Sequence, residues 1–231
     1  SDDLTPAETE WAYGEGEENP PIVLEWPQTG RKVSFNGIID RVDTDISKGL
    51  FRVLDYKTGD RRVDFKSLYA GLSVQLPAYL YAYRAANPDL MPTDAGYFIL
   101  KNPMIRVDIS KSADIQETVS ETKRKEFAVR GMSLSPDELR LCSEYAVKKI
   151  RQTCEKIFSG HFDVCPVYEK RGGGKSTCSY CDYKGICGID PRRPPFIQAP
   201  ELPGFLMPDG KKPTDREKFL RAIQGETEET T

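Results

Sequence analysis

The 231-residue chain is 38% hydrophobic and 30% charged, which is typical of a soluble globular protein and excludes a disordered chain. No apolar run approaches the roughly 20 residues that a membrane-spanning helix needs, so we expect no membrane partner. The net charge is −3, but residues 1–25 carry eight acidic side chains and no Lys or Arg, which leaves the middle of the chain basic. A basic middle suits a polyanionic partner and fits an ordinary mixed surface equally well.

The first part of the chain predicts mainly strands. Residues 1–21 are acidic and interrupted by Gly and Pro, so we expect mostly loop there. Residues 22–26 form a short apolar run typical of a strand. Residues 33–43 and 50–57 are rich in β-branched and aromatic side chains and flank a turn-like segment, which predicts a β-hairpin.

The rest of the chain predicts helices and one further strand, and therefore a mixed α/β fold. Residues 67–86 have apolar side chains at helical spacing, with Pro77 marking either a kink or the start of a helix. Residues 95–100 are compact and apolar, as in a central strand. A capping box at Ser135 opens a long helix that ends before Gly160. The remaining expectations are a charged helix over 112–130, a short final helix over 214–224, and an apolar face of the long helix made of Leu139, Cys142, Ala146, Ile150 and Ile157.

Two aspartates and a lysine on the predicted hairpin form the most informative pattern in the chain. Asp55 and Lys57 are two residues apart and so share one face of their strand. If the turn centres on residues 47–48, Asp40 lies opposite Asp55, with Cβ atoms about 5 Å apart. Carboxylates this close repel each other, and both lie in apolar sequence, so a divalent cation between them would relieve both costs.

These residue types suit the hydrolysis of a phosphodiester. Carboxylate oxygens on an open site suit Mg²⁺ or Mn²⁺, and a neighbouring ammonium group stabilises developing negative charge. The alternative is an ordinary strand end at which Asp40 pairs with Arg41 or Arg52. Asp43 and Asp45 are interpreted as turn residues.

The segments GIIDRVD, VLDYKTG and VQLPAYLYAY, in this order, resemble the PD-(D/E)xK nucleases of the RecB/AddB type over roughly residues 33–190. The resemblance implies a restriction-endonuclease-like αβββαβ core, with a mixed central sheet flanked by helices and a Cys-rich C-terminal extension. We accordingly divide the chain into an acidic segment (1–21), a nuclease core with a helical insertion (22–165), a Cys-rich extension (166–191) and a Pro-rich tail (192–231).

The resemblance also implies roles for individual residues. It assigns the catalytic set to Asp40, Asp55, Lys57, Gln75 and Tyr79. Of these, Asp40 and Asp55 would bind the metal, with the carbonyl of Tyr56 as a further ligand. Gln75 and Tyr79 match the family's QxxxY element and would share one helix face directed at the site and the DNA, unless they are merely a helix cap and a core aromatic residue.

Basic residues near these motifs are candidate DNA contacts. Arg41 follows the first metal-binding aspartate. Lys175 lies in Arg-Gly-Gly-Gly-Lys-Ser-Thr, which lacks the first glycine, the leading strand and the following helix of a phosphate-binding loop. We therefore interpret this segment as a basic loop that touches the DNA backbone.

The chain departs from the family pattern upstream of the hairpin. The family has an upstream helix that supplies a His or Glu to the metal, and no His precedes Asp40 here. Glu10 or Glu25 could take that place, although neither lies in a long predicted helix. The only histidine, His161, follows the end of the long helix and is given no catalytic role.

Three of the six cysteines form a tight group near the C-terminus. The chain shows no secretory leader, so we expect a reducing, cytoplasmic environment, which favours metal binding over disulfides. Cys178, Cys181 and Cys187 have the spacing of metal-binding thiolates. In the resembled subgroup such cysteines hold a [4Fe-4S] cluster with a fourth, N-terminal cysteine, which this chain lacks. Cys165 is the nearest substitute, and Zn²⁺ is the alternative occupant. Cys142 and Cys154 are interpreted as structural.

The function that the resemblance implies is a Mg²⁺-dependent DNA nuclease, and more specifically an exonuclease acting on DNA ends. Such a domain would work with a helicase or helicase-like subunit in double-strand break repair and recombination. The alternative is a non-catalytic DNA-binding or scaffolding module with a vestigial metal site. A third possibility is a small Cys-metal protein in which the acidic pair is incidental.

Overall fold

The computed structural model describes residues 4–59, 63–100, 127–132, 134–162, 164, 166–168, 178, 181–188, 197–198, 202–204, 207 and 211–228. The chain divides into two units. The first comprises Ser1–Val63 and Val74–Val147, and the second comprises Asp64–Ser73 and Lys148–Thr231. Within the described ranges, no helix has the combination of length and apolar character that crossing a bilayer requires.

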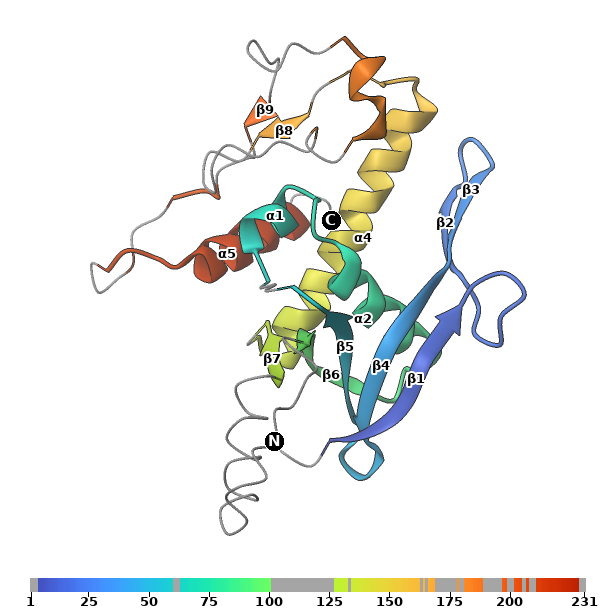
Figure 1. The fold of residues 1–231 in the computed structure, drawn as a ribbon, viewed down its shortest axis with the longest axis vertical. Helices are drawn as coiled ribbons and strands as arrows, with labels where there is room; N and C mark the ends of the chain where they lie inside the picture. The colour runs from blue at the N-terminus through green and yellow to red at the C-terminus, as the bar shows by residue number, and fades with distance from the viewer. Residues whose placement is uncertain are drawn as a thin grey trace, which may run out of the picture. The chain divides into compact units, whose positions relative to one another are not determined.

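A five-stranded mixed sheet forms the first unit, in the order β1-β4-β5-β6-β7 (Figure 1). The strands are β1 (Thr5–Tyr13), β4 (Gly37–Asp45), β5 (Leu50–Lys57), β6 (Met91–Leu100) and β7 (Phe127–Gly131). β5 and β6 run parallel, whereas the other neighbours in the sheet are antiparallel. β2 (Ile22–Trp26) and β3 (Arg31–Phe35) form a separate antiparallel ribbon. The predicted mixed sheet with flanking helices is therefore confirmed, as are the strand over 22–26 and the hairpin of β4 and β5.

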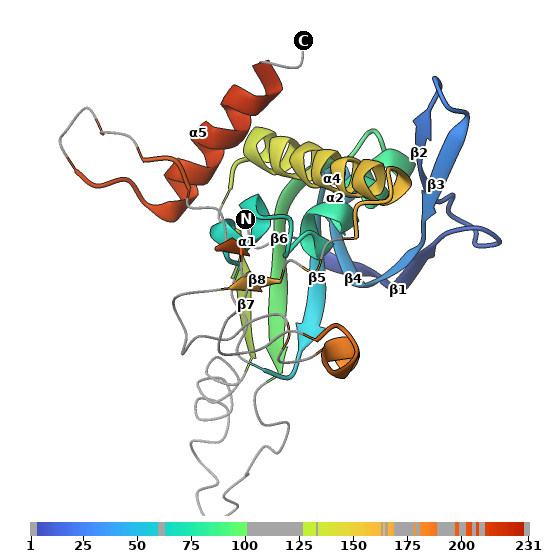
Figure 2. The same ribbon diagram turned by 90° about the horizontal axis from the view of Figure 1, so that it is seen from above.

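Helix α2 (Gln75–Ala86) covers one face of this sheet (Figure 2). Its Tyr83 packs against Trp11 of β1 and Phe51 of β5, with ring centroids 5.1 Å and 4.9 Å apart. The Tyr83 hydroxyl also donates a hydrogen bond of 2.9 Å to Glu8. The helix begins two residues before Pro77, where a missing backbone N–H costs nothing, so the predicted helix start is confirmed.

Helix α4 (Pro136–Phe158) begins at the predicted capping box. The Ser135 N–H donates to Glu138 Oε2 at 2.7 Å, and the Glu138 N–H donates to Ser135 Oγ at 3.3 Å. The predicted residues Leu139, Cys142 and Ala146 are fully buried. Ile157 is 47% exposed, so its placement in the apolar face was wrong. The described buried positions of α4 end one turn earlier, at Cys154.

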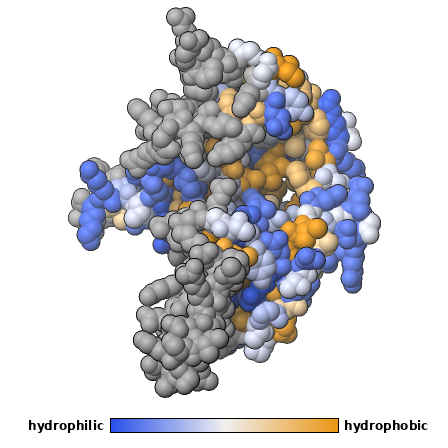
Figure 3. All heavy atoms as spheres, in the orientation of Figure 1, coloured by the Kyte–Doolittle hydropathy of each residue, from blue (hydrophilic) through white to orange (hydrophobic). Residues whose placement is uncertain are grey.

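The structure corrects two predicted elements. Residues 1–21 are not mostly loop, because β1 pairs along β4 as the outer strand of the sheet. Five of its nine residues are exposed, and Figure 3 shows hydrophilic and hydrophobic patches side by side in this part of the molecule. The helix expected over 112–130 is wrong for residues 127–130, where pairing with β6 makes a strand. The earlier part of that helix lies outside the described residues.

The second unit joins α1 (Phe65–Tyr69) to α5 (Asp215–Glu228), so the predicted final helix is confirmed. The rings of Phe65 and Phe219 lie 5.4 Å apart, and Lys66 Nζ lies 3.2 Å from Asp215 Oδ2. The same unit contains the C-terminal part of α4, the short strands β8 (Val167–Tyr168) and β9 (Ile197–Gln198), and the 3₁₀ turn η3 (Asp182–Gly185).

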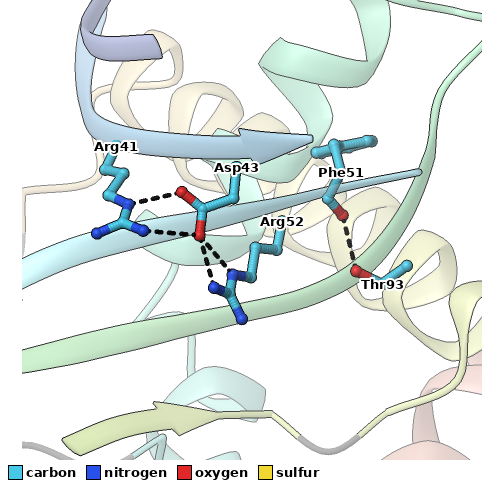
Figure 4. A network of polar contacts seen from close by, with 5 residues as sticks. All are labelled: Arg41, Asp43, Phe51, Arg52 and Thr93. Carbon is cyan, nitrogen blue, oxygen red and sulfur yellow. Dashed lines mark hydrogen bonds and ion pairs between the residues drawn. The ribbon is translucent and has the colours of Figure 1, made fainter. Parts of the chain in front are cut away.

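Asp43 is not a turn residue, because it lies within β4 and is fully buried. Its carboxylate binds two guanidinium groups (Figure 4). Arg41 donates from Nε to Oδ1 at 2.6 Å and from Nη2 to Oδ2 at 3.1 Å. Arg52, across the hairpin, donates from Nε to Oδ2 at 2.7 Å. The second predicted turn residue, Asp45, does cap the turn, since it accepts from the Lys48 N–H at 3.1 Å.

Replacing Asp43 should destabilise the fold strongly. Asp43→Ala leaves two guanidinium groups side by side without their counter-ion, and breaking a buried pair in this way costs about 3–5 kcal/mol. We expect the lower end of that range, because the side chains of Arg41 and Arg52 are 20% and 26% exposed. Urea denaturation measures the change in the free energy of unfolding, with Glu25→Ala as the exposed control. Equal losses in the two variants would contradict the buried network.

Candidate active site

The β4–β5 hairpin opens into a fork at the two predicted metal-binding aspartates. The ladder has the predicted register, in which paired residue numbers sum to 95, and it ends at Arg41 and Leu54. Beyond that pair β4 continues along β1 while β5 continues along β6, so the two strands separate. Asp40 lies in the opening, where its Oδ2 accepts a hydrogen bond of 2.7 Å from the Tyr56 N–H. Just beyond the last pair of the ladder, the Asp40 side chain thus supplies a hydrogen bond between β4 and β5, to the residue that follows Asp55.

Asp55 is the buried acid of the site. It is 2% exposed, and its Oδ2 forms an ion pair with Lys57 Nζ at 2.5 Å. Burial raises the pKa of Asp55 above its ordinary value, Lys57 opposes that rise, and the charge of Asp40 adds to it. The charges of the two carboxylates therefore oppose each other, although Asp40 and Asp55 are not the cross-strand pair that was predicted.

Lys57 is accessible from solvent, whereas the acid it pairs with is not. Its side chain is 31% exposed, and its ammonium group lies 5.9 Å from the centroid of the Tyr97 ring on β6. Lys57 shares a strand face with Asp55, Val53 and Phe51, the face that α2 covers. The ammonium group of Lys57 is thus held at the margin of the core, beside the buried carboxylate of Asp55.

The QxxxY residues occupy the first turn and a half of α2. Gln75 is exposed, Tyr79 is half-buried, and Gln75 Nε2 donates to the Tyr79 hydroxyl at 3.0 Å. Burial raises the pKa of Tyr79, and the charges of Asp55 and Asp40 raise it further. Tyr79 lies on α2, the helix that covers the sheet face carrying Asp55 and Lys57. The structure thus brings the five predicted catalytic residues, from two strands and a helix, to one end of the sheet.

The sequence analysis missed one aromatic neighbour of the site. Burial, and then the nearby Tyr79, raise the pKa of Tyr13 on β1 to about 12. Its ring lies directly over Gly37, where an added Cβ would stand only 2.7 Å from the Tyr13 hydroxyl oxygen. Glycine is therefore required at position 37. The alternation of Trp11 and Tyr13 was the available sequence pattern for this face, within a segment interpreted as loop.

Arg41 and Arg52, the two arginines predicted as partners of Asp40, both bind Asp43 instead. The alternative interpretation, in which Asp40 forms an ion pair with Arg41 or Arg52, is therefore wrong. The same finding makes Arg41 a weaker candidate for a DNA contact, because its guanidinium group already donates two hydrogen bonds to Asp43. The other predicted contact, Lys175, lies outside the described residues.

The two glutamates considered as upstream ligands differ sharply in position. Glu10 lies between Thr9 and Trp11, which pair with the neighbours of Asp40 on β4, so Glu10 stands across from Asp40. Its φ of 52° is in the left-handed region, which costs a non-glycine residue about 1–3 kcal/mol. Glu25, in contrast, lies on the β2–β3 ribbon and pairs with Lys32 at 2.5 Å.

The donor set at the fork fits a hard divalent cation. Asp40 and the buried Asp55 bring carboxylate oxygens, which such a cation prefers, to the fork, while the Tyr56 carbonyl remains a predicted ligand. No group of three or more His, Cys, Asp or Glu side chains among the described residues is arranged to hold a metal ion. A protein site here would thus use two carboxylates, with backbone oxygen and water completing the coordination.

The described residues do not bring the three clustered cysteines together as a metal site. Cys178 and Cys181 are half-buried and Cys187 is exposed, and none of the three forms a disulfide with another described cysteine. Cys165 lies outside the described residues. The iron–sulfur cluster and the zinc alternative therefore stay predictions, whereas Cys142 and Cys154 are buried, as expected of structural residues.

Known proteins match most of this chain. The model of the PD-(D/E)XK nuclease superfamily matches residues 2–188. Proteins named as subunits of an ATP-dependent helicase/deoxyribonuclease are similar to it: that of Moorella thermoacetica is 27% identical over 83% of this chain, and that of Clostridium kluyveri is 28% identical over 80%. The match covers 20% and 19% of these relatives, so the chain spans about a fifth of their length.

Ionisation of Asp55 and ionisation of Asp45 should change the stability of the fold in opposite directions as pH rises. Because the pKa of Asp55 is raised in the folded protein, its ionisation costs stability as pH rises above about 4. Asp55→Asn should therefore raise the melting temperature at neutral pH in EDTA, with the gain shrinking towards pH 4.

Asp45 provides the matched control. A hydrogen bond from the Ser47 hydroxyl, with help from Lys48, lowers the pKa of Asp45, so its charge contributes stability above about pH 4. Asp45→Asn should lower the melting temperature at neutral pH. Thermal melts from pH 3.5 to 7.5 measure both variants, and a loss in Asp55→Asn at neutral pH would contradict the burial argument.

Proposed function

Because the chain belongs to the PD-(D/E)XK nuclease superfamily, we propose that it is a nuclease domain that hydrolyses DNA phosphodiester bonds with a divalent cation, Mg²⁺ or Mn²⁺. The observation that carries the proposal is the fork between β4 and β5, where the buried Asp55, whose Oδ2 lies 2.5 Å from the ammonium group of Lys57, meets the second carboxylate of Asp40. A structural ion pair would need only one carboxylate. Two acids that repel each other at the edge of a core favour a bound cation.

The residues of the site divide the work of hydrolysis. A cation held by Asp40, Asp55 and the carbonyl of Tyr56 would supply an activated water and offset the charge on the phosphate. Lys57 contributes a second positive charge, which stabilises the negative charge that develops on the phosphate oxygens. The same ammonium group orients the attacking water by hydrogen bonding.

Gln75 and Tyr79 position the DNA strand in this proposal. A tyrosine hydroxyl is protonated at neutral pH, so Tyr79 can donate a hydrogen bond. Gln75 already donates to that hydroxyl, which leaves the tyrosine proton directed elsewhere. The exposed amide and the hydroxyl together can hold phosphate oxygens at the mouth of the site.

The biological setting is also a proposal. The relatives are named as subunits of a helicase/deoxyribonuclease, and this chain matches a fifth of their length. We infer a domain that acts on DNA ends as an exonuclease and works with a helicase or helicase-like subunit in double-strand break repair. The inferred setting is the cytoplasm.

A second candidate function is a DNA-binding or scaffolding module that does not cut. The observation that favours it is the metal site itself, which has two carboxylates and no third acidic or histidine ligand among the described side chains. Binding of DNA without cleavage in Mg²⁺ and in Mn²⁺ would support this candidate over the nuclease.

Substitutions at the acid and the lysine test the nuclease directly. Asp55→Ala and Lys57→Ala should each abolish cleavage of a labelled linear DNA in Mg²⁺ or Mn²⁺, because each removes a charge that the reaction uses. Circular dichroism checks that the fold survives, and Asp45→Asn is the carboxylate control that keeps activity. Cleavage retained in both alanine variants would defeat the proposal.

The two glutamates allow a sharper test of the upstream position. If Glu10 supports the site from β1, Glu10→Gln should lower the cleavage rate by about 10-fold or more, as loss of a group beside a metal typically does. Glu25→Gln removes the same charge from the β2–β3 ribbon and should leave the rate unchanged. Equal rates in the two variants would show that β1 adds no functional carboxylate.

A further inference from the structure

The buried ion pairs of Asp43 connect to the active site through an aromatic contact. Arg41 Cζ lies 5.9 Å from the centroid of the Phe98 ring on β6, within the range of a cation–π interaction. Phe98 meets the Tyr56 ring edge-on, with centroids 5.3 Å apart and an interplanar angle of 85°. Arg41 therefore contacts Asp43 on its own strand and an aromatic pair contributed by β5 and β6.

The two ends of this connection adjoin the two metal-binding aspartates. Arg41 directly follows Asp40, and Tyr56 directly follows Asp55. The Tyr56 N–H also donates the 2.7 Å hydrogen bond to Asp40. The contacts of Arg41 with Phe98 and of Phe98 with Tyr56 therefore connect β4 to β5 beside the fork, where the ladder itself has already ended.

The bridge lies on the opposite face of the sheet from the catalytic side chains. Arg41, Asp43 and Arg52 alternate with the residues that face α2. The Arg41 guanidinium is bound in two places by Asp43, and hydrogen bonds from Arg41 to Asp43 and then to Tyr56 raise its pKa. A permanent charge held this way suits a structural part better than a free contact with DNA.

We propose that Arg41 is a positioning residue, which sets the spacing of Asp40 and Asp55 by joining Asp43 to the Tyr56–Phe98 pair across the back of the sheet. This inference rests on the proposed metal-dependent nuclease and replaces the role of Arg41 as a DNA contact. Arg41 acts through its neighbours and touches neither cation nor substrate.

Arg52 makes the matched control possible. It binds the same Asp43 oxygen that Arg41 shares, at 2.7 Å from Nε, and is similarly exposed. Arg41→Gln and Arg52→Gln thus remove the same charge from the same carboxylate. The Arg41 variant alone breaks the contact with the aromatic pair.

The experiment measures Mn²⁺ binding to the full chain by electron paramagnetic resonance, together with melting temperature, kcat and the KM for DNA. Arg41→Gln should weaken Mn²⁺ binding about 10-fold or more, as groups behind metal ligands typically do, and lower kcat with KM for DNA unchanged. Arg52→Gln should lower the melting temperature similarly and leave Mn²⁺ binding unchanged. Phe98→Leu should weaken Mn²⁺ binding with both ion pairs intact, which keeps the test decisive if Arg41→Gln does not fold.

Three outcomes would overturn the inference. Unchanged Mn²⁺ affinity in Arg41→Gln, or in Phe98→Leu where Arg41→Gln does not fold, would show that the bridge does not set the carboxylate spacing. A raised KM for DNA with a weaker salt dependence and normal Mn²⁺ binding would assign Arg41 to the phosphate backbone instead. Equal loss of Mn²⁺ binding in Arg52→Gln would show that the effect of Arg41→Gln comes from lowered stability of the fold and not from the contact with the aromatic pair. If the wild-type chain binds Mn²⁺ and cuts no DNA, the nuclease proposal fails while the Mn²⁺ comparison still tests Arg41.

Discussion

The hydrogen bond from the Tyr56 N–H to the Asp40 carboxylate is the contact on which the site depends. A strand that leaves its partner exposes backbone groups that must find other partners, and here a side chain supplies the acceptor. That substitution brings one acid into the opening between the strands. The neighbouring residue on β5, Asp55, presents the second acid from within the core. The positions of the two carboxylates proposed to bind the metal thus follow from the separation of β4 and β5.

The same register that positions the acids also builds the network behind them. The pairing in which residue numbers sum to 95 places Asp43 opposite Arg52, and it ends one position before Asp40 and Asp55. One face of the hairpin therefore carries two carboxylates that share a single cationic side chain, Lys57, which pairs with Asp55. The other face carries a carboxylate that two arginines satisfy fully. Because side chains alternate along β4 and β5, the stabilising ion pairs of Asp43 and the proposed catalytic residues lie on opposite faces of the same hairpin.

The sequence predicted the hairpin, its register and the helix at Pro77, because these depend on local patterns: strand composition, a short turn and helical spacing. It missed β1, since an outer strand with one buried face and many polar residues resembles a loop. Asp43 was also misinterpreted, although the register already placed Arg52 opposite it. Glu10 shows a different limit, because a left-handed φ at a glutamate has no sequence pattern that predicts it.

The path of the chain between Lys57 and Gln75 has a practical consequence for dissection of the protein. Residues 64–73 leave the first unit and fold with the C-terminal half, where Leu68 is buried and Phe65 packs on Phe219. A truncation after residue 147 would therefore keep every proposed catalytic side chain yet strip the apolar cover from the connector between them. The minimal cleaving fragment, by this reasoning, extends to the C-terminal helix.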